Sequence, residues 1–138
     1  MYRSETQIRV RYGETDQMGY VYYGFYAMYY EVGRVESLRQ LGLTYRQLEE
    51  MGVMMPVLEN KSKYLSAAKY DDLLTIVTTL RERPGARIRF EYEIYNEQKT
   101  LIHTGETLLA FINKENKRPC RPPEEMTKLL EPFFANEV

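Results

Sequence analysis

The hydrophobic pattern changes its period near the N-terminus and then returns to the first period for most of the chain. Apolar and polar residues alternate over 7–12, which predicts a half-buried strand that ends at Gly13. Over 24–41 apolar residues recur every three or four positions, which predicts a helix that Gly42 can end. Strict alternation over 87–95 then predicts a strand with one apolar and one polar face.

The predicted helix has an apolar face and a charged one. The apolar face consists of Phe25, Met28, Val32, Val35 and Leu38. The charged residues Glu31, Arg34, Glu36 and Arg39 can pair with one another on the other face. A second, short helix is predicted over 44–51, where Thr44 can cap the start and Gly52 can end it.

The rest of the chain reads as strands joined by turns. Strands are predicted over 57–67, 74–80, 87–95 and 101–112, and a last helix over 124–134 begins after Pro123. A run of strands with a segregated helix favours an α+β fold with an antiparallel sheet. A length of 138 residues fits one domain, over 1–138, whose sheet curls around the helix of 24–41.

Charge and composition exclude several classes of protein. The 19 basic and 20 acidic residues give a net charge of −1, so no overall positive field attracts nucleic acid or an anionic membrane. No 18-residue apolar run and no signal-peptide pattern occur. The single thiol, Cys120, cannot form an internal disulfide. We therefore expect a cytoplasmic protein with no nucleic-acid or membrane partner.

Tyrosine is the residue type in excess, with 13 tyrosines and no tryptophan. Six of them lie between Tyr20 and Tyr30. Because a tyrosine joins a large apolar ring to a hydroxyl that needs a partner, such a cluster suits an interface or a partly polar pocket wall. A core that happens to be rich in tyrosine is the alternative.

Most familiar catalytic motifs are absent from the sequence. GxSxG, the P-loop, GxGxxG and CxxC do not occur, and the only histidine, His103, lies in a predicted strand where a structural role is favoured. We therefore expect no metal and no cofactor. The remaining candidate is Asp16, in the loop before the long helix, where unpaired N–H groups and the helix dipole gather.

A carboxylate beside such N–H groups can attack a carbonyl or activate water while the N–H groups stabilise the oxyanion. The alternative is that Asp16 only caps a turn or the helix. Glu31 lies about 10 Å further along the helix axis and suits an ion pair with Arg34. The direction of the Glu14 side chain is left open by the sequence.

Two segments resemble one known family. Residues 12–26, YGETDQMGYVYYGFY, resemble the active-site motif of hotdog-fold thioesterases of the 4-hydroxybenzoyl-CoA thioesterase-like branch. Residues 68–76, AKYDDLLTI, are similar to the segment by which this family enters its third strand. The resemblance covers about residues 5–130 and implies a hotdog fold, in which a curved antiparallel sheet of about five strands wraps around one long central helix.

The resemblance also implies an activity and a site. The activity is hydrolysis of an aromatic or short-to-medium acyl-CoA to the free acid and CoA, in a dimer or dimer of dimers whose sites form between subunits. Asp16 falls on the catalytic carboxylate, and Tyr23 on the position whose backbone N–H polarises the carbonyl. The expected substrate-binding residues are Gly19, Tyr20, Val21, Tyr22, Gly24 and Tyr26. Arg83 and Arg87 are candidates for the CoA phosphates, or else solvated charges at strand ends.

Two other functions remain open at this stage. Hotdog folds can bind acyl-CoA or acyl-carrier protein without turning the ligand over, and a non-catalytic binding module predicts saturable binding without hydrolysis. A dehydratase or hydratase is less favoured because His103 lies far along the sequence from the helix entrance.

Overall fold

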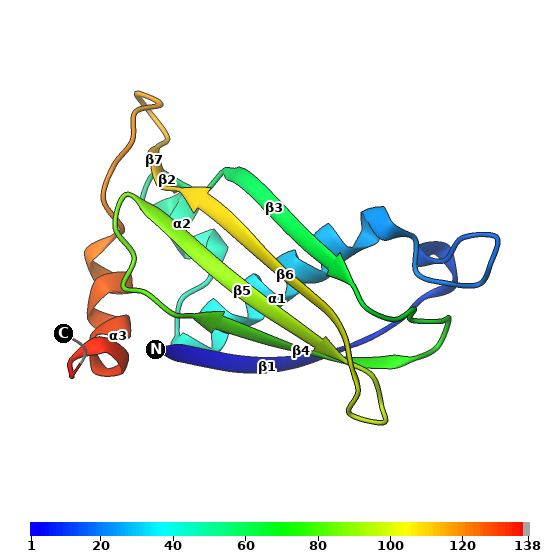
Figure 1. Ribbon diagram of the computed structural model, residues 1–138. Coiled ribbons are helices and arrows are strands. Elements are labelled where there is room, and N and C mark those ends of the chain that lie inside the picture. Colours follow the sequence, from blue (N-terminus) through cyan, green and yellow to red (C-terminus); the bar gives the residue numbers. More distant parts are fainter. Residues whose placement is uncertain (137–138) are drawn as a thin grey trace.

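The computed structural model describes residues 1–136, and five antiparallel strands form its main sheet (Figure 1). Their spatial order is β1-β4-β5-β6-β3, and the long helix α1, Tyr26–Leu41, crosses one face of this sheet. The strands are β1 Tyr2–Arg9, β3 Val57–Tyr64, β4 Leu73–Leu80, β5 Arg87–Tyr95 and β6 Leu101–Ala110. The predicted α+β fold, with a five-stranded antiparallel sheet and one long helix, is confirmed.

Short elements complete the chain. They are the 3-10 turns η1 Tyr12–Glu14 and η2 Tyr23–Phe25, the helices α2 Tyr45–Glu50 and α3 Glu124–Phe134, and the two-stranded sheet of β2 Val53–Met54 with β7 Ile112–Asn113. Gly42 ends α1 with φ of 107°, and the Thr44 hydroxyl accepts from Gln47 N–H at the start of α2, as predicted. In residues 1–136 no helix is both long and apolar enough to cross a bilayer.

Several strand boundaries differ from the prediction. β1 begins at Tyr2 and ends at Arg9, because a 3-10 turn replaces the strand at Tyr12, whose side chain is 78% exposed. β3 stops at Tyr64, and the predicted last strand is divided between β6 and β7. The strict alternation of β5 is confirmed, since Ile88, Phe90, Tyr92 and Ile94 are all buried.

The buried face of α1 is not the predicted one. It consists of Tyr26, Tyr29, Tyr30, Gly33, Arg34, Ser37 and Leu38. Of the predicted face only Leu38 is fully buried, and the other four residues lie on its flanks, half-buried. A side chain at Gly33 would come within 2.6 Å of Thr78 Oγ1, so glycine lets the helix approach β4 closely. The Tyr92 ring of β5 lies beside this contact, 3.6 Å from where the Cβ would be.

Arg34 does not form the expected ion pair with Glu31. Its side chain is buried, and its guanidinium donates to the hydroxyls of Tyr92 at 3.0 Å, Tyr45 at 3.3 Å and Thr107 at 3.3 Å. Arg34 lies on the buried face of α1, where a charged group needs hydrogen-bonding partners. The other predicted pair, Arg39 with Glu36, is present at 3.3 Å.

A layer of aromatic rings lies between α1 and the sheet. The Tyr30 ring stacks on Tyr92 with centroids 4.3 Å apart, and its hydroxyl is 2.5 Å from both Ser62 Oγ and His103 Nε2. The Tyr26 ring stacks on His103 with centroids 4.0 Å apart. The Tyr30 hydroxyl and His103 Nε2 therefore both have hydrogen-bond partners within this layer. The layer joins α1 to the sheet by packing and by hydrogen bonds.

Candidate active site

Asp16 lies in a tight hairpin between β1 and α1. Its N–H donates to Tyr20 C=O at 2.8 Å, and Thr15 pairs with Val21 across the hairpin. One carboxylate oxygen, Oδ1, accepts from the N–H groups of Met18 at 2.9 Å and Tyr20 at 3.2 Å. Asp16 thus caps its own turn and not the helix. Among residues 1–136 no hydrogen bond is made by the second oxygen, Oδ2.

The second motif in the sequence holds this hairpin in place. Val21 N–H donates to Ala68 C=O at 2.8 Å, and Tyr20 pairs with Lys69. The Asp72 carboxylate accepts from Lys69 N–H at 2.8 Å and so shapes the turn that receives the hairpin. This structural role of residues 68–72 is not evident from periodicity, because it depends on a contact between two distant loops.

The entrance to α1 follows directly after the hairpin. Tyr22 N–H donates to Glu14 C=O at 2.9 Å, which places the start of η2 beside the segment that carries Asp16. In the described part of the chain no backbone carbonyl accepts from Tyr23 N–H or Gly24 N–H. A side chain at Gly24 would lie 2.8 Å from the Tyr22 ring, so this exposed ring would have to shift if residue 24 were not glycine. Unpaired N–H groups at a helix start can stabilise an oxyanion.

Glu14 points away from Asp16 and into the protein. Its side chain is 3% exposed and accepts from Arg11 N–H, Arg11 Nε and the Tyr29 hydroxyl, each at 2.9 Å, and from Arg11 Nη2 at 2.8 Å. Burial opposes ionisation, but the hydrogen bonds and charge of Arg11 together with the Tyr29 hydroxyl outweigh it and hold the pKa of Glu14 below its ordinary value. Glu14 is therefore a buried, fully hydrogen-bonded carboxylate.

An open pocket of about 620 Å³ surrounds Asp16. It is lined by Tyr12, Thr15, Asp16, Gln17, Gly19 and Tyr70. The rings of Tyr12 and Tyr70 meet edge to face with centroids 5.7 Å apart, and both are more than half exposed. The sequence did not single out these two tyrosines, although both lie within or beside the two motifs.

The expected substrate-binding residues divide into two groups. Tyr20, Tyr22 and Tyr23 are exposed around the helix entrance, and Gly19 and Gly24 are also exposed. Val21 and Tyr26 are buried, with 6% and 3% exposure, so their side chains lie beneath the entrance. The Tyr64 hydroxyl donates to Tyr23 C=O at 3.3 Å and brings the end of β3 to the same place.

His103 lies inside the aromatic layer and is fully buried. Burial lowers its pKa to about 4, so the imidazole is neutral at pH 7. Its contacts are with Tyr26, Tyr30 and Tyr64, which accords with the structural role favoured from the sequence. Within residues 1–136 no group of three or more His, Cys, Asp or Glu side chains is placed to hold a metal ion.

Arg83 and Arg87 lie at the other end of the sheet from Asp16. The eight-residue strand β4 begins near the hairpin and ends before Arg83, and it spans about 25 Å at about 3.3 Å per residue. Arg83 pairs with Glu131 at 2.7 Å and donates to Phe134 C=O at 2.9 Å, so it fastens α3. The structure therefore does not bring either arginine to the Asp16 of the same chain.

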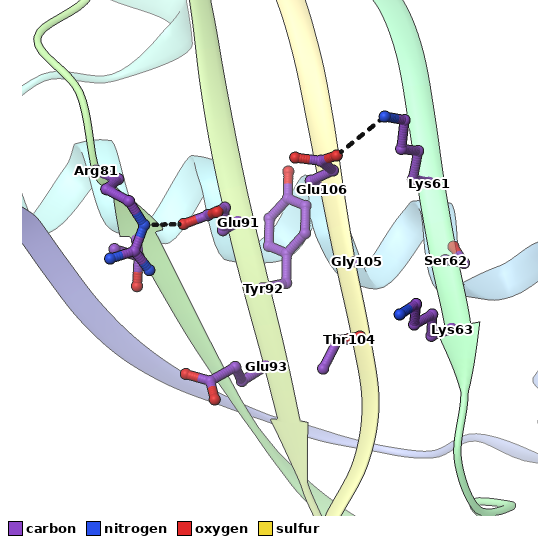
Figure 2. Close-up of a pocket in the computed structure, with 11 residues that line it drawn as sticks. Lys61, Ser62, Lys63, Arg81, Glu91, Tyr92, Glu93, Thr104, Gly105 and Glu106 are labelled. Carbon is purple, nitrogen blue, oxygen red and sulfur yellow. Dashed lines mark hydrogen bonds and ion pairs between the residues drawn. The ribbon is translucent and has the colours of Figure 1, made fainter.

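A second hollow of about 470 Å³ lies on the outer face of the sheet, away from α1 (Figure 2). Among its lining residues, Lys61 pairs with Glu106 at 3.4 Å and Arg81 pairs with Glu91 at 2.8 Å (Figure 2). These charges neutralise one another in pairs, and the hollow lies on the opposite side of the sheet from the helix entrance. The hollow is therefore remote from the helix entrance, and the Asp16 hairpin remains the stronger candidate.

Comparisons with known proteins identify the family. The family model described as Thioesterase-like superfamily matches residues 10–130. The putative acyl-CoA thioesterase YneP of Bacillus subtilis is 33% identical over 121 residues, which is 88% of each chain. The acyl-CoA thioesterase YbgC of Haemophilus influenzae is 35% identical over 121 residues, which is 86% of this chain and 88% of the relative.

Solved structures show the same fold. The DHNA-CoA thioesterase of Staphylococcus aureus superposes with a TM-score of 0.92 at 31% identity, covering 98% of this chain and 93% of that one. A 4-hydroxybenzoyl-CoA thioesterase superposes with a TM-score of 0.83 at 19% identity, covering 94% and 99%. The predicted resemblance is thus confirmed. The chain belongs to the thioesterase-like superfamily, a family of hotdog-fold thioester hydrolases.

Proposed function

We propose that this protein hydrolyses acyl-CoA thioesters at the hairpin and helix entrance, with Asp16 as the catalytic carboxylate and the Tyr23 backbone N–H as the oxyanion donor. The observation that carries the proposal is the pairing of Tyr22 N–H with Glu14 C=O, which sets the segment of Asp16 against the unpaired N–H groups at the start of α1. The identity to thioesterases of 33% and 35% over most of the chain supports the reaction type.

The chemistry follows from the two groups. The thioester carbonyl oxygen accepts from Tyr23 N–H, and the negative charge that develops on it is stabilised there. In one route an Asp16 oxygen attacks the carbonyl carbon, the CoA thiolate leaves, and water cleaves the resulting anhydride. In the other, Asp16 takes a proton from a water that attacks the carbonyl carbon, the C–S bond breaks, and the proton passes to the departing thiolate. Both routes yield the free acid and CoA and restore the Asp16 carboxylate. Oδ2 is the available oxygen, since Oδ1 is held by Met18 and Tyr20.

The substrate carries an aromatic or a short-to-medium acyl group. Exposed rings of Tyr20, Tyr22 and Tyr23 surround the helix entrance and suit such a group. Beneath them the buried Tyr26 ring, stacked on His103, closes the way into the core. A long acyl chain therefore has no path between α1 and the sheet of its own subunit. The similarity to a DHNA-CoA thioesterase supports an aromatic acyl group.

The working form is a homo-oligomer in the cytoplasm, as a dimer or a dimer of dimers. The edge strand β3 is exposed along most of its length and pairs on one side only, with β6, so its other edge can accept another strand. At the opposite end of the sheet, Arg87 and the Glu131-bound Arg83 are candidates for the phosphates of a CoA that is bound at the site of a neighbouring subunit. Gly19, Val21 and Gly24 shape the backbone that receives the thioester.

The test is thiol release from aromatic, short-chain and long-chain acyl-CoAs by the wild-type protein and by Asp16→Asn. Asparagine keeps the Oδ1 acceptor for Met18 and Tyr20, so the hairpin should remain folded while the charge is lost. We expect kcat to fall at least ~100-fold, as when a general acid or base is removed. Glu115→Gln, an exposed carboxylate in a distant turn, serves as the control and should retain wild-type kcat.

An Asp16→Asn protein with wild-type kcat would exclude the proposed role of Asp16. Saturable binding of acyl-CoA without thiol release from any substrate would instead favour a non-catalytic binding protein. If the substrate preference is for long chains, the proposed acyl class is wrong even though the chemistry stands.

A further inference from the structure

Glu14 is a buried carboxylate that the proposed chemistry does not use. It lies two residues before Asp16, yet its side chain is only 3% exposed and turns toward α1. Four donor groups, three on Arg11 and one on Tyr29, lie within 2.8–2.9 Å of its two oxygens. A carboxylate is rarely buried to this extent unless it is paired and hydrogen-bonded, and these four donors hold Glu14 in one fixed geometry.

The contacts of Glu14 join three parts of the site. Its side chain binds Arg11, where β1 leads into η1, and Tyr29, one turn into α1. Its backbone carbonyl binds the N–H of Tyr22, the residue immediately before Tyr23. One residue therefore connects the segment that carries Asp16, the body of the helix and the backbone of the helix entrance.

We propose that Glu14 is a positioning residue that fixes Asp16 relative to the N–H groups of Tyr23 and Gly24. The inference rests on the proposed function, because it assigns Glu14 an effect on Asp16. A fully satisfied buried network is rigid, and the two reacting groups need placement to within about 0.5 Å. Glu14 does not touch the substrate, so it acts through the relative position of two other groups.

The Tyr29 contact distinguishes this arrangement from an ordinary surface ion pair. Tyr29 is fully buried, and its hydroxyl donates to Glu14 Oε1 at 2.9 Å. The Arg11 side chain, in contrast, is 71% exposed and can exchange Glu14 for water. In Glu14→Gln an amide NH2 replaces one of the two acceptor oxygens that face these four donors, so the network can no longer be fully paired. Tyr29→Phe removes the link between the segment of Asp16 and the helix directly.

The experiment measures kcat and KM for Glu14→Gln and Tyr29→Phe with the best acyl-CoA substrate. We expect kcat to fall at least ~10-fold while KM changes less than ~3-fold, because a misplaced reacting group affects the transition state more than binding. Glu36→Gln is the matched control, since Glu36 also pairs with an arginine three residues away but is partly exposed on α1. Its kcat should equal that of the wild type.

A second measurement separates positioning from general stability. In an Asp16→Asn background, Glu14→Gln should reduce kcat less than ~2-fold further, because there is no carboxylate left to position. If Glu14→Gln lowers kcat by the same factor in the Asp16→Asn background as in the wild type, the inference is wrong. Should Glu14→Gln fail to fold, Tyr29→Phe, which keeps the ring, gives the same comparison.

The outcomes of the two proposals are distinguishable. If Asp16→Asn is inactive and both Glu14→Gln and Tyr29→Phe keep wild-type kcat, the positioning role is wrong and the proposed function stands. If Asp16→Asn is itself fully active, the proposed function is wrong, and the positioning role falls with it.

Discussion

Nine of the 13 tyrosines form two groups, one buried and one exposed, that differ in their surroundings. The buried group, between α1 and the sheet, consists of Tyr26, Tyr29, Tyr30 and Tyr92. The exposed group, around the hairpin and helix entrance, includes Tyr12, Tyr20, Tyr22, Tyr23 and Tyr70. In the buried group the hydroxyls of Tyr29, Tyr30 and Tyr92 each have a side-chain partner. One residue type thus builds both the core and the wall of the proposed site.

The comparison shows that the tyrosines contribute to this protein in two different ways. A buried ring with a paired hydroxyl adds both apolar area and a specific hydrogen bond, so it stabilises one arrangement of helix and sheet. An exposed ring adds little to stability and remains free to contact a ligand. Substitution of a buried ring or hydroxyl should therefore lower stability, whereas loss of an exposed hydroxyl should leave stability nearly unchanged.

The largest effect is expected from Gly105→Ala, which crowds the buried group. A side chain at Gly105 would overlap the hydroxyl and ring of Tyr30. Because Tyr30 is held by Tyr92, Ser62 and His103, it cannot move aside, and we expect the free energy of unfolding to fall by about 3 kcal/mol. Urea unfolding measures the loss of unfolding free energy. Gly13→Ala is the control, because a Cβ at Gly13 meets only open space. Equal losses in the two variants would show that the aromatic layer between α1 and the sheet is not tightly packed.

A smaller effect is expected from removing one buried hydroxyl. Tyr30→Phe leaves His103 Nε2 without its partner in the core, which should cost about 2 kcal/mol of unfolding free energy. Tyr70→Phe removes a hydroxyl from a ring that is 55% exposed and should change stability by less than about 0.5 kcal/mol. Thermal and urea unfolding of both variants would show whether the two groups differ as described.

The buried group should also make stability depend on pH. Burial lowers the pKa of His103 to about 4, below its ordinary value of 6.5, so the unfolded chain binds the proton more readily than the folded one. The contribution of neutral His103 is fully present above pH 6.5 and is lost progressively as the pH falls toward 4. Between pH 6.5 and 4, the unfolding free energy of His103→Gln should decrease less steeply with falling pH than that of the wild type. Parallel curves would mean that His103 titrates normally.

The smallest effect is expected in the exposed group, at Tyr23. The proposed role of this residue belongs to its backbone N–H, and its side chain is 65% exposed. Tyr23→Phe should therefore keep kcat within about 2-fold and stability within about 0.5 kcal/mol of wild type. A large loss of kcat, measured by thiol release, would mean that the Tyr23 hydroxyl, and not the backbone N–H, has the catalytic role.

Strand alternation was the most reliable guide from sequence to fold. The pattern of β5 predicted each buried residue, because its polar and apolar positions are strictly separated. The face of α1 was predicted wrongly because its core side contains tyrosines, a glycine, a serine and an arginine, which hydrophobic spacing does not register. Close packing of Gly33 on β4, a tertiary contact, decides which face is buried.

The candidate site was predictable in part. The position of Asp16 before the helix and the two motifs were visible in the sequence. The direction of Glu14 was not, because it is set by Tyr29, fifteen residues away, and by the turn at Arg11. The contact between the hairpin and Ala68 was equally hidden, since it arises only when β1 pairs with β4.

That last contact has a consequence for the order in which the protein assembles. A nascent chain that ends before Ala68 already contains Asp16, Tyr23 and all of α1, but it lacks the carbonyl that holds Val21 N–H and the strand that pairs with β1. Closing this long loop costs entropy that only later strands repay. The neighbouring strands β4, β5 and β6 follow one another through short turns and can pair first. We therefore expect the hairpin of the proposed site to become ordered late, after β4, β5 and β6 have paired.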